Sequence, residues 1–191
     1  IVIPEGVTSI GSSTFSGCSS LYYKGTIEDW CDINFYGGIG CDLYINGKYI
    51  NDQGNLVIPE GVININSYAF YGFNYNSIIL PSTLVSIQDF AFSSVSIIYN
   101  NSNLDLTIGS KSFGSIAYKA KIIYNSDGSK EYIADNEAIL YETSEGYKFI
   151  YDSINGYVLY DYIGNETSIT LPEYINGKIY KINLPNSLNV N

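Results

Sequence analysis

A short apolar pattern recurs along the chain and constrains its fold more than any other feature. Three segments align without gaps, namely Ile1–Phe15, Leu56–Phe70 and Ile78–Phe92. The second and third copies lie 22 residues apart at every shared position. A unit this short cannot bury its own apolar side chains, because only stacking against neighbouring copies closes its interior. The pattern therefore predicts a solenoid of stacked coils.

Each copy contains the same columns of residues, counted from a proline. The columns are Pro4, Pro59 and Pro81; Val7, Val62 and Leu84; Ile10, Ile65 and Ile87; Phe15, Phe70 and Phe92; and Cys18, Phe73 and Val95. The residues before each proline have β character, so alternation sends Ile78 and Leu80 to one face and Ile79 to the other. Proline has no N–H to donate and ends the pairing. We expect the apolar columns to fill a continuous interior.

The residue two positions before each proline points outward in this scheme. Val2, Val57 and Ile79 would then form an apolar stripe, with one β-branched residue per coil. We predict that this stripe contacts a partner. The alternative is that it packs against an inserted segment or a neighbouring molecule.

Weaker copies follow the three clear ones. Ile108 to Phe113 keeps the step from isoleucine to phenylalanine, with Asn100 in the proline position. Fragments recur at Leu171–Ile175 and Leu184–Leu188. Both ends of the sequence read as parts of repeats, so we expect neighbouring repeats of the same chain beyond them.

The complete pattern from Ile3 to Leu21 resembles the BspA-like class of leucine-rich repeat. The stretches 22–30, 98–102 and 163–172 resemble segments common in bacterial members. Phe73 and Val95 depart from the resemblance, since they stand where the family prefers cysteine, and so does the long non-repeat stretch after residue 120. The resemblance implies a leucine-rich-repeat solenoid, β-rich with short helical or 3-10 turns. It also implies a secreted or surface-anchored protein linked to adhesion, with no catalytic residue.

We divide the chain into a solenoid over 1–125, with an insertion at 22–55, an antiparallel β meander over 126–165, and a degenerate or truncated repeat over 166–191. In the insertion, Thr26 and Asp29 fit a capping box that predicts a helix from Ile27 to about Ile33. We expect Trp30 to anchor this helix on the solenoid edge. Asn46-Gly47 predicts a hairpin with a type I′ turn within 43–50.

The meander is predicted from alternating strands between glycine-containing turns. The turns are Asp127-Gly128, Glu145-Gly146 and Asn155-Gly156, and 174–180 predicts one more hairpin. Segments 127–129 and 152–155 resemble calcium loops only superficially. Neither has the ligand spacing of an EF-hand, so turns explain them better.

Composition excludes several functions. The net charge is -10, no arginine or histidine occurs, and an acidic chain is repelled by nucleic acid. Histidine-dependent acid–base and triad chemistry is excluded, and no P-loop is present. No apolar run is long enough to span a membrane, and no signal peptide is visible. We expect no cofactor, no metal and no enzymatic activity.

The three cysteines, Cys18, Cys31 and Cys41, leave two interpretations open. Cys31 and Cys41 could form a disulfide in an oxidising compartment. We favour three buried thiols that act as small apolar side chains.

Six tyrosines on adjacent predicted strands of the meander are further candidates for partner binding, because tyrosine is common in binding hot spots. They are Tyr141, Tyr147, Tyr151, Tyr157, Tyr160 and Tyr162. Cross-strand packing is the alternative. We predict a non-catalytic interaction module at a cell surface or secreted, which binds a host or matrix protein or another cell. A structural spacer and a glycan-binding module remain alternatives.

Overall fold

The computed structural model describes residues 1–50, 54–135, 137–152, 154, 156–165, 171, 174 and 180–182. The chain forms two compact units, Ile1–Ser126 and Asp127–Asn191. The elements of the first unit are β1 (Val2–Ile3), β2 (Ser9–Ile10), β3 (Ser20–Tyr23), α1 (Ile27–Cys31), β4 (Asn34–Phe35), β5 (Asp42–Ile45), β6 (Lys48–Tyr49), β7 (Asn55–Val57), β8 (Asn64–Ile65), β9 (Phe70–Leu80), β10 (Ser86–Ile87), β11 (Phe92–Asn100), the 3-10 helix η1 (Phe113–Ser115) and β12 (Ile122–Asn125). Those of the second are β13 (Lys130–Ile133), β14 (Ile139–Glu142), β15 (Tyr147–Asp152), β16 (Gly156–Tyr162) and β17 (Lys181–Ile182).

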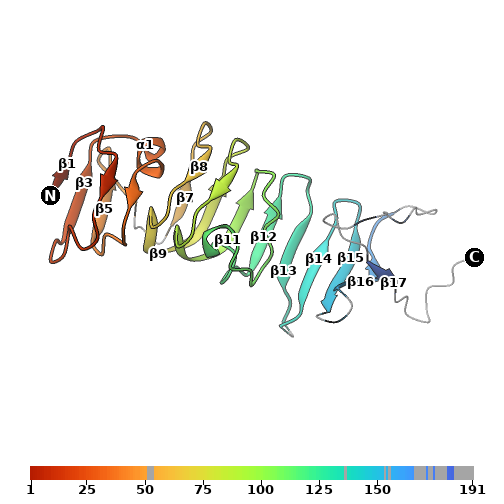
Figure 1. Ribbon diagram of the computed structural model, residues 1–191. Helices are drawn as coiled ribbons and strands as arrows, with labels where there is room; N and C mark the ends of the chain where they lie inside the picture. Colours follow the sequence, from red (N-terminus) through yellow and green to blue (C-terminus); the bar gives the residue numbers. More distant parts are fainter. Residues whose placement is uncertain are drawn as a thin grey trace, which may run out of the picture. The chain divides into compact units, whose positions relative to one another are not determined.

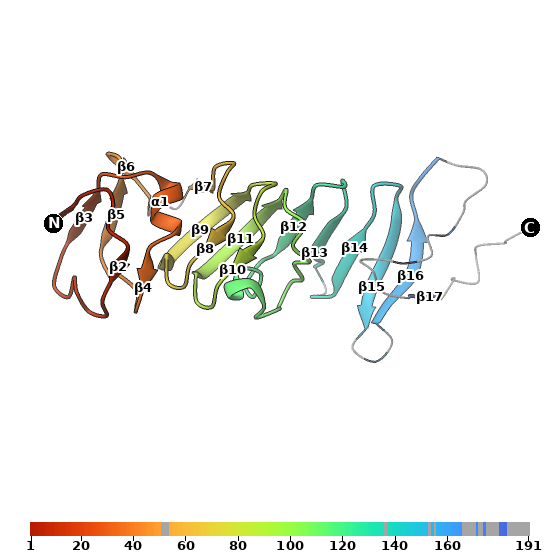
Figure 2. The same cartoon turned by 45° about the horizontal axis from the view of Figure 1, so that its top comes forward.

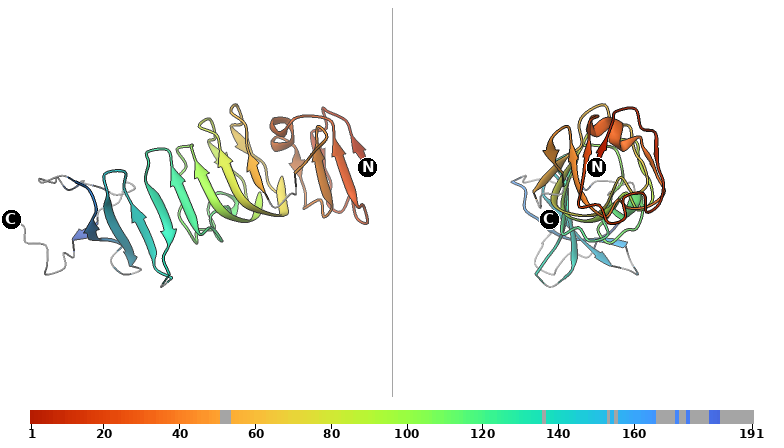
Figure 3. Two further views of the ribbon diagram at one scale, coloured as in Figure 1. Left: turned by 180° about the vertical axis from the view of Figure 1, so that it is seen from behind. Right: turned by 90° about the vertical axis from the view of Figure 1, so that its left-hand side faces the viewer.

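The first unit is a solenoid of stacked coils, which confirms the predicted fold. On one side of the coils, β1, β3 and β5 pair in parallel, and so do β7, β9, β11 and β12. The short parallel pairs β2–β4 and β8–β10 form elsewhere on the same coils. Figure 1 shows the long strands side by side, and the right-hand view in Figure 3 shows the coils of this unit around one interior. Parallel pairing follows because each coil repeats the path of the one before it.

Side-chain hydrogen bonds repeat with the period of the sequence. Ser82 Oγ donates to Glu60 Oε2 at 2.9 Å, a partner 22 residues away. The same separation recurs in four further residue pairs, which are joined by bonds from Gly61 N to Thr83 Oγ1, Ser77 Oγ to Asn55 Oδ1, Ser86 Oγ to Asn64 Oδ1 and Gln88 Nε2 to Asn66 Oδ1. The polar residues between the apolar columns therefore also hold adjacent coils in register.

Most of the apolar columns fill the interior as predicted, but Val7 and Cys18 of the first copy are only half-buried. Leu56, Ile78, Ile98 and Ile123 lie opposite one another along the strands and are all buried. The rings of Phe70 and Phe92 stack with centroids 5.3 Å apart and planes 15° apart. Phe15 is also buried, in the first coil. Burial of such side chains contributes ~1.5–3 kcal/mol each to stability.

One polar atom in this interior lacks a partner. The Tyr75 hydroxyl is buried and makes no hydrogen bond with any described residue. Its ring is held edge-on by Phe70 and Phe73, at 6.4 and 6.3 Å between centroids. Burial, followed by the nearby Cys31, raises the pKa of Tyr75, so the phenol stays protonated.

The capping box of α1 is present. Thr26 Oγ1 accepts from the Asp29 amide at 3.2 Å, and the Thr26 amide donates to Asp29 Oδ2 at 3.0 Å. The helix ends at Cys31, somewhat earlier than predicted. Trp30 does not lie on the solenoid edge, and that prediction is wrong. Its side chain is fully buried, and its Nε1 donates to the Ala69 carbonyl at 2.8 Å.

The segment 22–55 was expected to interrupt the array, but most of it builds a coil. Leu21 and Tyr23 of β3 pair with Leu43 and Ile45 of β5, and β4 pairs with β2. The coil is closed by α1 in place of a repeat turn, because the fully buried Trp30 fills the interior there. The hairpin β5–β6 is a second departure from the repeat, and its turn residues Asn46 and Gly47 both have positive φ. Positive φ at both positions is the geometry of the type I′ turn predicted there.

The fourth copy differs from its prediction in two respects. Leu80 lies opposite Asn100, so Asn101 and not Asn100 occupies the proline position. Phe113 is half-buried and has a φ of +50°, so it does not fill the interior as Phe70 does. The backbone at Gly114 instead approaches the preceding coil closely, and an added Cβ there would clash with the Gln88 carbonyl oxygen.

In the second unit, the predicted meander strands form β13–β16, which pair antiparallel in chain order (Figure 2). Strand β17 joins the edge of β16 in parallel. The predicted hairpin at 174–180 and most of the predicted degenerate repeat at 166–191 fall outside the described residues.

Candidate functional site

The outward face of the first unit carries two rows of apolar and aromatic side chains. In each row, the residues are register partners on adjacent strands. The N-terminal outer row is Val2, Tyr22, Tyr44 and Tyr49. The central outer row is Val57, Ile79, Tyr99 and Tyr124. In the central outer row, the residue before each row member along its strand is buried, namely Leu56, Ile78, Ile98 and Ile123, so strand alternation exposes the row.

Ring stacking orders both rows. Tyr22 and Tyr44 stack with centroids 4.6 Å apart and planes 18° apart, and Tyr49 continues from Tyr44 at 5.0 Å. Tyr99 and Tyr124 stack at 5.2 Å and 11°. Cross-strand aromatic pairs of this kind contribute roughly 0.2–1 kcal/mol each. The stacking therefore favours one arrangement of the rings before any partner arrives.

The rows are accessible to a partner. Val2 is 59% exposed, Val57 is 47% and Tyr99 is 40%. Tyr22, Tyr49 and Tyr124 are exposed to a similar degree, whereas Tyr44 and Ile79 are half-buried by their neighbours. Half-buried Ile97 and Ile122 pair with each other beside the central outer row. Contiguous exposed apolar surface of this kind is typical of interaction sites.

Three of the predicted partner-binding tyrosines are instead core residues of the second unit. Tyr141, Tyr147 and Tyr157 are buried with Phe149 and Leu159 in one cluster. Tyr157 donates its hydroxyl to Glu131 Oε1 at 3.2 Å within this core. Burial raises the pKa of Tyr141. For these three residues the prediction of surface contact is wrong, because alternation places them on the covered face of the meander.

The other three tyrosines of the meander lie in different surroundings. Tyr151 is exposed and contacts the Tyr157 ring edge-on at 5.4 Å. Tyr162 is half-buried and packs on the core cluster, 4.9 Å from the Tyr147 ring. Tyr160 is half-buried, and burial raises its pKa. They do not form one exposed row.

The predicted stripe of Val2, Val57 and Ile79 belongs to these rows, but the sequence did not reveal its aromatic members. Those members are Tyr22, Tyr44, Tyr49, Tyr99 and Tyr124. Prolines mark the columns in the clear copies, but Lys24 stands in the proline position after Tyr22. With Asn100 in the proline position, the outward position two residues earlier falls on Ile98 instead of Tyr99. Counting from the buried isoleucines Ile78, Ile98 and Ile123 would have found two of the five.

Neither a metal centre nor a membrane-spanning element is seen in the described part of the chain. No group of three or more histidine, cysteine or acidic side chains gathers there. No helix among these residues is long and apolar enough to cross a bilayer. The outer rows are thus the surface feature that most needs explanation.

The sequence was compared with models of known protein families. The family model of the BspA type leucine-rich repeat region matches residues 1–33 and 48–136, in six copies. The chain belongs to the BspA-type leucine-rich repeat family. No curated protein and no solved structure gives a significant match. The matched residues include both outer rows except Tyr44.

Membership in this family bears on function at a coarse level. BspA-type repeat proteins are commonly associated with cell surfaces and adhesion. Leucine-rich-repeat solenoids are typically non-catalytic scaffolds for protein–protein interaction. A preformed, regularly spaced aromatic face fits such a scaffold.

Proposed function

We propose that this protein is a non-catalytic interaction module at a bacterial cell surface, or secreted, that binds a host or matrix protein, or a protein on another cell, through its outer rows. The single observation that supports this is the stacked, exposed tyrosines of the rows. They provide large contact area with few rotatable bonds, as binding hot spots do. Adjacent coils repeat the contact every ~4.8 Å, so many weak contacts add up over an extended partner.

The net charge of -10 adds a long-range electrostatic preference for basic partners. An acidic surface speeds encounter with basic partners and disfavours acidic ones. We therefore expect association to be fastest with cationic proteins and to slow as salt is raised.

Glycan binding through exposed tyrosines is less well supported than protein binding. A sugar stacks on an open aromatic face, but Tyr99 and Tyr124 cover one face of each other's ring. The same holds for Tyr22 and Tyr44. What the rows offer is mainly ring edges and hydroxyls, which suit an irregular protein surface better.

The test is binding of the full chain to a panel of immobilised extracellular matrix and host-surface proteins. We expect one or more panel proteins to bind, and Tyr99→Ser with Tyr124→Ser to weaken that binding at least tenfold. Tyr36→Ser is the matched control, because Tyr36 is 70% exposed but lies outside the rows. Unchanged binding by the row variant would reject the outer rows as the contact surface.

A structural spacer is the alternative, in which the array only separates other parts of a longer protein. A spacer needs no exposed aromatic rows, and its tyrosines would serve packing, as Tyr141 and Tyr157 do. If no panel protein binds at micromolar concentration, the spacer interpretation replaces ours. A glycan array run in parallel would distinguish sugar recognition, because a signal lost with the row variant would point to the glycan alternative.

A further inference from the structure

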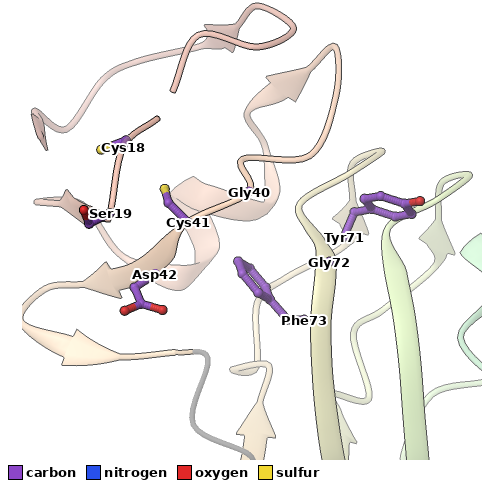
Figure 4. A pocket seen from close by; sticks show the side chains of 8 residues that line it. All are labelled: Cys18, Ser19, Gly40, Cys41, Asp42, Tyr71, Gly72 and Phe73. Atoms are coloured by element: carbon purple, nitrogen blue, oxygen red, sulfur yellow. The ribbon is translucent and has the colours of Figure 1, made fainter. Parts of the chain in front are cut away.

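Two of the three cysteines lie on the wall of one surface cleft. Cys18 and Cys41 line a hollow of about 470 Å³ in the first unit (Figure 4). The other lining residues are Ser19, Gly40, Asp42, Tyr71, Gly72 and Phe73. Both cysteines are partly exposed, which corrects our expectation that all three thiols are buried. Small molecules in solution can therefore reach them.

The register of the coils brings the two thiols together. Ser20 of β3 lies opposite Asp42 of β5, and the Asp42 amide donates to the Ser19 carbonyl at 3.1 Å. Cys41 therefore lies beside Ser19, the residue that follows Cys18. Neighbouring strands are ~4.8 Å apart, so Cys18 and Cys41 are close in space. Disulfides join Cα atoms separated by about 4.4–6.8 Å, a range that adjacent parallel strands satisfy.

The side chains already interact. The Cys41 thiol hydrogen-bonds to Cys18, and the Cys18 thiol donates to the Ser20 carbonyl at 3.2 Å. Figure 4 shows Cys18 and Cys41 on two separate segments of the chain that border the cleft. Cys31 is the opposite case, since it is fully buried in α1 and burial raises its pKa strongly. The disulfide between Cys31 and Cys41 considered from sequence spacing therefore has an inaccessible member, and none of the three cysteines forms a disulfide in the structure.

We propose that Cys18 and Cys41 form a reversible disulfide that links the first two coils when a small-molecule disulfide is available as the oxidant. One thiol loses its proton and attacks the small disulfide, forming a mixed disulfide and releasing one small thiol. The second cysteine, as its thiolate, then attacks the mixed bond and releases the second small thiol. The protein loses two protons and two electrons, and the oxidant is reduced to two thiols.

The bond would act as a covalent staple across the cleft wall. It would close the chain over residues 18–41, a loop that contains α1, and so restrict the unfolded state. Burial, and next the proximity of Cys18, raise the pKa of the Cys41 thiol. Thiolate is the reacting form, so we expect exchange to be slow at neutral pH and to accelerate as the pH rises.

The experiment treats the full chain, under native conditions, with oxidised glutathione, followed by alkylation in denaturant and peptide mass mapping. We expect alkylatable thiols to fall from three to one, with Cys18 and Cys41 joined in one cross-linked peptide and Cys31 alkylated. The melting temperature should rise on oxidation and return after reduction. Persistent glutathione adducts without a cross-link, or a cross-link to Cys31, would overturn the proposal.

Two variants separate the staple from general thiol chemistry. Cys18→Ser should leave Cys41 as a glutathione adduct, with no cross-link and no rise in melting temperature. Cys31→Val keeps both cleft cysteines and should form the cross-link as the unmodified chain does. Absence of the cross-link in Cys31→Val, with that variant folded by circular dichroism, would also refute the assignment.

Discussion

Replacing Trp30 with phenylalanine tests the coil that the sequence presented as an insertion. Trp30 is the only tryptophan in the chain and has no exposed surface. Its ring packs between Tyr23 and Phe35, with centroids 5.3 and 4.8 Å away, and its Nε1 bonds to the Ala69 carbonyl. Phenylalanine keeps the aromatic packing in part but has no donor.

The expected cost has two parts. An acceptor left unsatisfied in the interior costs about 1–3 kcal/mol. The smaller ring leaves a cavity, and core truncations of this size cost roughly 1 kcal/mol more. We therefore expect Trp30→Phe to lower the free energy of unfolding by about 2–4 kcal/mol. Urea denaturation followed by far-ultraviolet circular dichroism measures it without relying on tryptophan emission.

A matched control comes from the surface. Tyr36→Phe changes a 70% exposed ring and should alter stability by less than about 0.5 kcal/mol. If Trp30→Phe were equally neutral, the indole would not lie in a packed interior. The coil formed by β3, α1 and β4 would then be wrong.

Three further substitutions test separate parts of the first unit. Tyr75→Phe should raise stability by about 1 kcal/mol in urea titrations, since it removes a buried hydroxyl that has no partner among the described residues; a loss of similar size would contradict this. Gly114→Ala should lower stability by roughly 1–3 kcal/mol, because φ is +65° and the new Cβ would meet the Gln88 carbonyl oxygen; an unchanged melting curve would refute that packing. Hydrogen bonds from the backbone and side chain of Thr26 hold the pKa of Asp29 below its ordinary value, which is near 4. This carboxylate therefore contributes its full stabilisation at pH values above about 4. The contribution is lost as the pH falls through the lowered pKa. Asp29→Ala should therefore cost about 0.5–1.5 kcal/mol at pH 7 but progressively less below pH 4, and a cost independent of pH would exclude the capping carboxylate as its source.

The sequence predicted the coil because proline and the inward columns repeat at a fixed spacing. Ile65 and Ile87 are buried as expected. The capping box of Thr26 and Asp29 predicted α1 correctly, because it depends only on residues close together in the sequence. The sequence could not show that Trp30 closes a coil. That role depends on Ala69, which lies 39 residues away and is brought close only by stacking.

The outer rows were only partly predictable for a related reason. Alternation identifies two faces of a strand but does not say which one the rest of the protein covers. For Val57, its position two residues before Pro59 indicated the outward face correctly. For Tyr141 and Tyr157 no such marker exists, and the covered face of the meander followed from contacts among distant strands.

The measurement that tests the account most directly compares two neighbouring residues on opposite faces of β11. Ile98 is fully buried, whereas Tyr99 beside it is 40% exposed in the central outer row. With a partner identified from the binding panel, Tyr99→Ser should weaken binding at least tenfold and change the unfolding free energy by no more than about 1 kcal/mol. Ile98→Ser should lower stability by several kcal/mol and leave the partner affinity of the folded fraction nearly unchanged. Equal loss of binding in both variants, or loss only with Ile98→Ser, would contradict the outer face as the binding surface.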